Sequence, residues 1–491
     1  MIIPNLQPEA PLIAAILEFD ADIIESVLAE ERLRNLKDGS SIMYDTTAFN
    51  LTMMYGLEAV TVPSNLEVGL KEWSPQNISI KTNPEAIIWA VDGVDDNSVA
   101  FAARLMEKGV EVRIIDKEAL LSKQSLSRGS IAVLAMDNPE YEDLSETVNS
   151  IASDLDISVL SIESGFGAEE LPDWGGRHFR LLERPQIAIL SQSGFSSYDV
   201  GVSWWSLDHH LGIRHSQIDA SLVNYADLRR YNTIILPSGY RDMGEYEKKV
   251  LSDWMEQGGT LIAHAASSSA LASEQGIGSV KLLQNTFEES EKYNISLQRE
   301  LSALYEELDI ESVNSNKVDL DTAYPWEQSE GKYPPSQLEY RDNWQSIFMP
   351  SGAFVSGRTD QEHWLTFGTN STLPLLYRSY PVLMSDDSSE APIRVGVFSD
   401  SAKANTYSTI NWSDIPPGKE LNVRMSGLLW PEAAQRIANS AYLTRDRIGK
   451  GQLILFSGEP NFRGATLGTN RVWLNAVVYG AGLGTEPRIT P

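Results

Sequence analysis

The stretch from Pro185 to His264 alternates short apolar runs with longer amphipathic segments, and this order constrains the fold more than any other part of the sequence. The apolar runs are 185–190, 231–239 and 260–265, and the amphipathic segments between them are 200–212 and 245–259. Continuous apolar runs of this length are typical of strands buried on both faces, and parallel strands need crossover helices between them. The pattern therefore predicts an α/β fold with a doubly wound, mostly parallel sheet.

A chain of 491 residues is too long for one hydrophobic core, so we expect several domains. Residues 1–62 are predicted to be a helical lead-in that packs on the following domains, with one or two helices in 10–36 that end near Gly39. Residues 63–180 are predicted to form a first α/β module, also doubly wound and mostly parallel. Residues 181–491 are predicted to form the second, interrupted by a helical and loop-like insertion at 281–345.

Within these modules the periodicity of apolar residues predicts individual elements. The predicted strands are 85–93, 110–115, 129–135, 157–162, 352–357, 373–378, 393–398 and 451–458. The predicted helices are 97–109, 139–155 with Pro139 near its first turn, 281–310, one that starts at 431, and 470–482. The Gly-rich segment 165–184 is predicted to be a linker, and 313–343 to be loop-like.

Charge and cysteine content exclude several classes of function. The formal net charge is −29, and an acidic protein repels phosphate backbones, so we expect no nucleic-acid partner. The chain has no cysteine, which removes disulfides, thiolate zinc sites and cysteine nucleophiles. No stretch reaches the roughly 20 apolar residues of a membrane span. The first twenty residues lack a basic region before their apolar part, so no signal peptide is expected.

Blocks of sequence spread over almost the whole chain resemble a known family. They include SIMYDTTAFNLTMMYGLEA (41–59), RGSIAVLAMDN (128–138), RPQIAIL (184–190), YDVGVSWWSLDHHLG (198–212), LRRYNTIILPSGY (228–240), LSDWMEQGGTLIAHAAS (251–267), EHWLTFG (362–368), IGKGQLILFSGEPNFRG (448–464) and VWLNAVVYG (472–480). Together they resemble the C-terminal, non-zinc region of large bacterial zinc carboxypeptidases of the carboxypeptidase A-like metallopeptidase family. The resemblance implies a second module with a class I glutamine amidotransferase-like fold.

The zinc motif of that family is absent from this chain. Zinc is held there by an HxxE pair and a later histidine, which leave an open position for water. None of the six histidines is followed by a glutamate three residues on. The resemblance therefore implies that zinc belongs to an upstream or separate peptidase catalytic domain, with no cofactor in this chain. It also implies a peptide or cell-wall substrate, and favours a periplasmic or extracellular location with the parent enzyme.

Amidotransferase chemistry needs a cysteine on a sharp strand-to-helix turn, and that turn is expected within 260–270. Ser267 is a candidate replacement nucleophile, or its neighbour Ser268, with His264 close by in sequence. A serine-rich loop after a strand is more often a helix cap or a turn, and that structural interpretation is favoured.

Other polar residues form two candidate sites. His209 and His210, beside Asp208 and near His215, are candidate metal ligands, but adjacent histidines on a helix point about 100° apart, which favours a structural role. The carboxyl ends of parallel strands form a crevice where open α/β sheets bind ligands. Candidate residues for a carboxylate or sugar in that crevice are Ser191, Ser193, Ser196, Ser238 and Gly239. The competing interpretation is that they merely connect strands to helices.

Asp45 and Arg463 lie in two of the resembling blocks and are expected to be buried polar anchors.

Three functions are compatible with these observations. The leading hypothesis is a non-catalytic accessory region of a zinc carboxypeptidase-like protein. The second is a standalone hydrolase or amidotransferase-like enzyme with Ser267 or His264 in the crevice. The third is a ligand-binding module.

Overall fold

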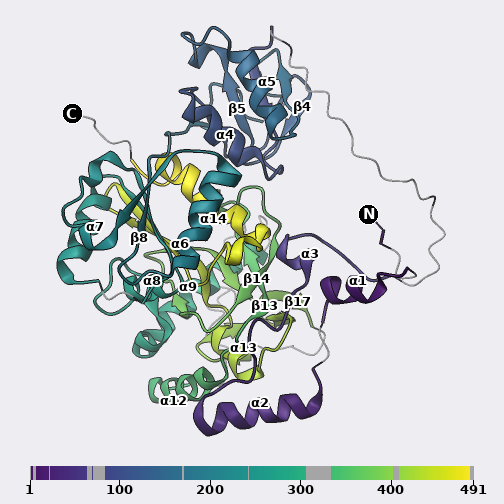
Figure 1. The fold of residues 1–491 in the computed structure, drawn as a ribbon, viewed down its shortest axis with the longest axis vertical. Helices are drawn as coiled ribbons and strands as arrows, with labels where there is room; N and C mark the ends of the chain where they lie inside the picture. Colours follow the sequence, from purple (N-terminus) through teal and green to yellow (C-terminus); the bar gives the residue numbers. More distant parts are fainter. Residues whose placement is uncertain are drawn as a thin grey trace, which may run out of the picture.

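The computed structural model describes residues 2–3, 7–20, 23–62, 69, 83, 85–168, 171–240, 243–305, 333–401 and 408–486. It is a mixed α/β structure, in which a small sheet at one end sits above a large central sheet (Figure 1). No helix in the described ranges is long and apolar enough to cross a membrane.

The helices are α1 Ala10–Leu17, α2 Glu25–Asp38, α3 Leu51–Met54, α4 Ser98–Glu107, α5 Leu144–Asp154, α6 Ser197–Trp205, α7 Glu245–Glu256, α8 Ala265–Leu271, α9 Ser290–Tyr305, α12 Pro335–Gln345, α13 Pro431–Ile437 and α14 Leu467–Leu483. A π-helical segment, η2 Ser206–Leu211, continues α6.

The strands of the small sheet and its hairpin are β1 Ile88–Val91, β2 Arg113–Ile115, β3 Ala119–Leu121, β4 Gln124–Leu126, β5 Ile131–Leu134, β6 Leu160–Ile162 and β7 Phe179–Leu181. The later strands are β8 Ile187–Ser191, β9 His215–Asp219, β10 Thr233–Leu236, β11 Thr260–His264, β12 Lys281–Leu282, β13 Ala353–Thr359, β14 Thr372–Tyr377, β15 Leu383–Met384, β16 Glu390–Val395, β17 Val397–Asp400, β18 Ser408–Ile410, β19 Ser413–Ile415, β20 Lys419–Asn422, β21 Arg424–Ser426, β22 Ala441–Ile448 and β23 Gly451–Phe456.

The central sheet has a parallel half and an antiparallel half. Strands β9, β8, β10, β11 and β23 lie side by side in that order, and each neighbouring pair is parallel. From β23 the sheet continues through β22, β16, β13 and β14, and these neighbours are antiparallel. The sequence predicted strands at the positions of β8, β10, β11 and β23, but not β9. Strand β22 lies where only a helix starting at 431 was expected.

Helices cover both faces of the parallel half, which is why its inner strands β8, β10, β11 and β23 are buried along their whole length. One face carries Ile189, Ile235 and Ile262 and packs with residues of η2 and α14. The other face carries Leu190, Leu236 and Leu261 and packs with residues of α7 and α8. Gly212 adopts a left-handed φ of 68° and ends the helical run, as the sequence predicted.

The small sheet corrects the prediction for the first module. Its strand order is β6-β1-β5-β2-β7, and every pair in it is antiparallel. The expected parallel sheet is therefore wrong here. The error arose because short apolar runs indicate burial on both faces but do not fix strand direction. The expected linker 165–184 contains β7, which pairs with β2, and α5 begins at Leu144 and not near Pro139.

The insertion also differs from its prediction. The expected helix 281–310 begins as β12 and two short 3₁₀ turns, and α9 starts only at Ser290. The expected loop 313–343 includes most of α12, which begins at Pro335 as helices often do. Residues 306–332 lie outside the described part of the chain. The boundaries 1–62, 63–180, 181–491 and 281–345 remain predictions.

Helix α9 is fixed to the sheet by a buried arginine. Arg394 on β16 is almost fully buried, and its guanidinium donates to both carboxylate oxygens of Glu300, at 2.5 and 2.7 Å. It also donates to Ser385 Oγ at 2.9 Å and to the Asn439 carbonyl at 3.2 Å. Charge-assisted bonds of this bidentate kind are stronger than neutral ones.

We predict that Arg394→Ala destabilises the protein by about 3 kcal/mol, because it strands the partly buried Glu300 carboxylate and two further acceptors. Urea unfolding followed by circular dichroism measures this change. The control is Arg229→Ala, which removes an exposed pair with Asp227 and is expected to leave the free energy of unfolding almost unchanged. Equal effects of the two substitutions would contradict the role of Arg394.

Candidate functional site

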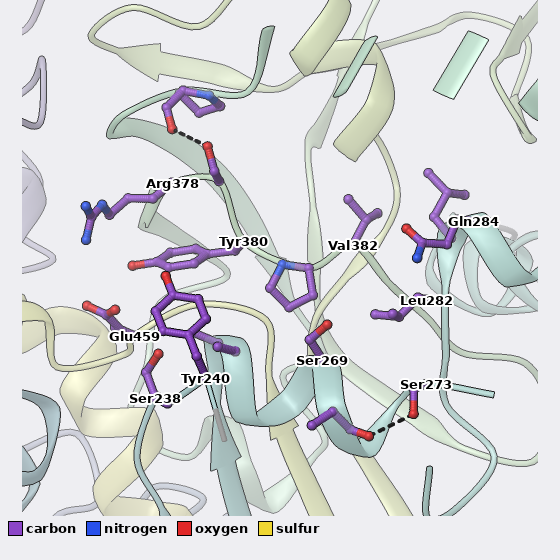
Figure 2. Close-up of a pocket in the computed structure, with 18 of the residues that line it drawn as sticks. Ser238, Tyr240, Ser269, Ser273, Leu282, Gln284, Arg378, Tyr380, Val382 and Glu459 are labelled. Atoms are coloured by element: carbon purple, nitrogen blue, oxygen red, sulfur yellow. Dashed lines mark hydrogen bonds between the residues drawn. The ribbon is translucent and has the colours of Figure 1, made fainter. Parts of the chain in front are cut away.

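A large cavity lies at the carboxyl ends of the parallel strands. Its volume is about 1010 Å³, and the loops that follow β10, β11 and β23 line it through Ser238, Gly239, Ala265 and Glu459. Arg378, which follows β14, lines it from the antiparallel half. Figure 2 shows the labelled side chains of this cavity, which come from both halves of the sheet. Parallel strands end at the same edge, so the position of the cavity follows from the sheet topology.

The turn between β11 and α8 is centred on Ala265. This residue has a φ of 44°, a left-handed conformation that is uncommon for any residue other than glycine. It comes directly after His264, the last residue of β11, and is the first residue of α8. The structure therefore places a sharp strand-to-helix turn inside the expected range 260–270. The side chain at its apex is a methyl group, which has no nucleophilic atom.

The two candidate serines in α8 are engaged in hydrogen bonds. Ser267 Oγ donates to the Pro237 carbonyl at 2.6 Å, and Ser268 Oγ donates to the Phe456 carbonyl at 2.7 Å. Both residues are buried. These bonds attach the start of α8 to the ends of β10 and β23, which is the structural role that the sequence also allowed.

His264 lies in the core. Its side chain is 1% exposed and packs edge-on against the rings of Phe456 and Trp473. Its Nε2 atom has no hydrogen-bond partner, and burial lowers the pKa of the imidazole to about 3. The structure thus brings His264 and Ser267 to the same turn, but it provides no hydrogen bond between them.

We predict that His264→Leu makes the protein more resistant to acid. The folded state holds this imidazole neutral down to about pH 3, whereas the unfolded chain takes up a proton below about pH 6.5. The contribution of the neutral imidazole to the free energy of unfolding is therefore fully present above pH 6.5 and is lost as the pH falls toward 3. Leucine removes that loss and leaves no buried nitrogen unpaired.

The measurement is urea unfolding at pH 4 and at pH 7.5. The variant is expected to lose less stability than the wild type between these pH values, by on the order of 2 kcal/mol. An unchanged pH dependence in the variant would contradict the burial of a neutral His264.

Of the five crevice candidates, Ser238 and Gly239 line the cavity. The other three serve the loop after β8: Ser191 Oγ donates to the Ile218 carbonyl, Ser193 Oγ donates to Asp219, and Ser196 Oγ accepts from the Asp199 amide at the start of α6. A close approach of backbones explains Gly239, because a Cβ there would lie 2.8 Å from the Gly194 carbonyl oxygen.

The candidate metal ligands lie around a tryptophan. The ring centres of His209 and His210 lie 5.0 and 4.5 Å from the ring centre of Trp205. The two imidazole ring centres are 6.0 Å apart. In the described ranges no group of three or more histidines, aspartates and glutamates could hold a metal ion. The packing of both histidines against Trp205 agrees with the structural role that the sequence favoured.

Four polar groups that the sequence did not single out as a site lie in or next to the cavity. Arg378, Tyr380 and Glu459 line the cavity, and Asp199, at the start of α6, lies close enough to Glu459 to act on its carboxyl. Burial raises the pKa of Glu459 to about 7, and the nearby Asp199 carboxylate adds to this rise. Burial also raises the pKa of Asp199, while Arg378 acts to lower both values.

Asp45 and Arg463 form a closed ion pair beside this group. Arg463 donates to both carboxylate oxygens of Asp45, at 2.7 and 3.0 Å, and these bonds lower the pKa of the carboxyl. The pair anchors the lead-in to the loop after β23, although the arginine side chain is 56% exposed. The expectation of a polar anchor is confirmed, and the expectation that it is buried is wrong for Arg463.

We predict that Glu459→Gln stabilises the protein at pH 8 but not at pH 5. The folded state favours the protonated carboxyl up to about pH 7, whereas the unfolded chain ionises near pH 4.5. The cost of ionisation is therefore absent below pH 4.5 and complete once the pH exceeds about 7. Thermal or urea unfolding should show a gain on the order of 1–2 kcal/mol at pH 8 only. A gain of the same size at both pH values would contradict this assignment.

No protein-family model and no curated protein matches the sequence. Among solved structures, a putative ThuA-like protein from Bacteroides uniformis shares 12% identity at a TM-score of 0.28, over 59% of this chain and 88% of that one. An exo-β-1,4-mannosidase from Opitutaceae bacterium strain TAV5 shares 10% identity at a TM-score of 0.28, over 62% of this chain and 37% of the mannosidase. A β-galactosidase from Rahnella sp. R3 shares 12% identity at a TM-score of 0.27, over 60% of this chain and 31% of the galactosidase. The chain spans less than two fifths of these two glycosidases, and the scores identify no family.

Proposed function

We propose that this chain is a non-catalytic ligand-binding region that works as an accessory to a zinc carboxypeptidase-like catalytic domain. The observation that carries the non-catalytic part is Ala265, whose methyl group stands at the apex of the strained turn where a nucleophile would be needed. The accessory part rests on the sequence resemblance. Zinc would belong to the catalytic domain, since the described residues of this chain do not fit it.

The parallel half of the central sheet supports an amidotransferase-like, doubly wound second module. Both of its faces carry helices, and the turn after β11 has the backbone form of a nucleophile elbow. The strain at that turn persists because Ser267 and Ser268 hold the start of α8 to two neighbouring strands. A turn of this shape positions the cavity wall even without a reactive group.

The cavity would bind a polar part of a peptide or cell-wall substrate. Its volume of about 1010 Å³ exceeds that of a single small ligand, and Arg378, Tyr380 and Glu459 offer both charge signs in it. A partner peptidase domain would then act on the part of the substrate that extends from the cavity. Such binding raises the local concentration of substrate at the catalytic domain without new chemistry.

The alternative is a standalone hydrolase with Ser267 as nucleophile. It would require the Ser267 hydroxyl to leave the Pro237 carbonyl and to find a base, and His264 is buried among aromatic rings on the strand side of the turn. The observed bonds therefore favour the non-catalytic function.

We predict that the purified chain is not labelled by a fluorophosphonate serine probe and does not release C-terminal residues from peptides, with or without added zinc. Intact-mass spectrometry and an amino-acid release assay measure the two activities. The matched variants are Ser267→Ala and His264→Leu, which should behave as the wild type does. Labelling that disappears in Ser267→Ala would establish the hydrolase instead, and zinc-dependent release by this chain alone would refute the accessory function.

The accessory role has its own test. A reading frame with an HxxE motif next to the one that encodes this chain is expected, and its product should bind this chain in analytical ultracentrifugation. Failure of that product to bind would contradict the partnership but not the ligand site.

A further inference from the structure

Arg378 keeps most of its hydrogen-bonding capacity open. Its Nε donates to the Ser351 carbonyl at 3.0 Å, and its guanidinium carbon lies 5.4 Å from the centre of the Phe462 ring. Within the described part of the chain it has no carboxylate partner within salt-bridge distance. Because the residue lines the cavity, its terminal nitrogens can meet a ligand there.

Glu459 is a carboxylate in the same cavity that also lacks an ion-pair partner among the described residues. It lines the same cavity, is influenced electrostatically by Arg378, and yet forms no ion pair with it among the described residues. Neighbouring arginines behave differently: Arg463 closes on Asp45 and Arg436 closes on Asp342, at 2.7 Å in each pair. Two opposite charges therefore face one cavity without neutralising each other.

Tyr380 supplies a third open group. The residue is 9% exposed, and its buried hydroxyl has no partner at normal hydrogen-bond geometry, although Glu459 lies near enough for the hydroxyl to lower the pKa of that carboxyl. The hydroxyl interacts electrostatically with Glu459, Arg378 and Asp199, and Figure 2 shows it on the side of the ring where Arg378 and Glu459 lie. A buried hydroxyl without a partner costs free energy, and a ligand that bonds to it recovers that cost.

We propose that Arg378, Tyr380 and Glu459 bind the two charged ends of a small zwitterion, with its carboxylate against Arg378 and the Tyr380 hydroxyl and its ammonium group against Glu459. This inference rests on the proposed function, because it names the class of ligand for the same cavity. Guanidinium groups suit carboxylates through paired N–H donors, and an ammonium group suits a carboxylate as a compact charge.

The charges around Arg378, Tyr380 and Glu459 explain why a zwitterion should bind more tightly than a lone anion or a lone cation. A lone anion at Arg378 would be repelled by Glu459 and Asp199, and a lone cation at Glu459 would be repelled by Arg378. A ligand that carries both charges satisfies both sites and removes both repulsions.

Binding should depend on pH through Glu459. Burial, together with the Asp199 carboxylate, raises the pKa of its carboxyl to about 7, whereas Arg378, Tyr380 and Arg463 act to lower it. The ammonium group requires the ionised carboxylate, so affinity should rise as the pH increases from about 5.5 to about 8. Below about pH 7 the binding reaction should release a proton, which is measurable in buffers with different heats of ionisation.

The test is isothermal titration calorimetry of the full chain with glycine, β-alanine and 4-aminobutyrate, which place the two charges at increasing separations. Acetate and ethylammonium are the two half-ligands. We expect at least one zwitterion to bind roughly 10-fold or more tightly than either half-ligand. Arg378→Gln and Glu459→Gln should each weaken that binding roughly 10- to 100-fold, the range for a lost charge-assisted hydrogen bond.

Tyr380→Phe is the mildest substitution in the cluster, because it removes one hydroxyl and keeps the buried ring, and it should weaken binding by several-fold. The controls are Arg229→Gln and Glu30→Gln, which alter exposed residues that do not line the cavity and should bind as the wild type does. Circular dichroism melting confirms that each variant is folded.

The inference is overturned if no zwitterion exceeds its half-ligands, or if folded Arg378→Gln and Glu459→Gln bind as the wild type does. Incubation of the same mixtures, followed by mass spectrometry, separates this result from the proposed function. Chemical conversion of a bound zwitterion would refute the non-catalytic function while supporting the site. Absence of both binding and conversion would refute the site alone.

Discussion

Parallel pairing of β8, β10, β11 and β23 is the constraint on which the rest of the structure depends. Parallel strands start and end in step, so the residues just beyond them must share one edge of the sheet. That edge brings together Ser238, Ala265 and Glu459, which are far apart in the sequence. The strained turn at Ala265 is tolerated because the buried bonds of Ser267 and Ser268 fix the first turn of α8 in place.

Strands β8, β10, β11 and β23 could be predicted from the sequence because burial on both faces produces mostly apolar runs such as Thr260–His264, whereas the polar strand β9 could not. The same signal failed for β1 and β5, which are equally apolar but antiparallel, since strand direction depends on how connections run in space. The turn after β11 was expected within 260–270 because the amidotransferase-like resemblance implies one there. Its left-handed φ was not, because alanine carries no signal for that conformation.

The cluster at the cavity was harder to predict. Glu459 follows the predicted strand 451–458 and so lies at a predictable edge. Arg378 follows β14, the strand at the far end of the antiparallel half, and no periodicity places its side chain near Glu459. The lead-in adds Asp45, which pairs with Arg463 and so leaves Arg378 without that partner. Only the folded structure shows which charged side chains form ion pairs with each other and which do not.

An arginine and a glutamate that share a cavity and do not pair are the basis of the proposed ligand site. A crystal structure of the ligand-free protein at about pH 8, where Glu459 is ionised, measures their separation directly. We predict that the nearest Arg378 guanidinium nitrogen and Glu459 carboxylate oxygen lie more than about 4 Å apart, the limit for an ion pair. A closed Arg378–Glu459 pair in that crystal would contradict the proposal, because the cavity would then offer no open charges to a ligand.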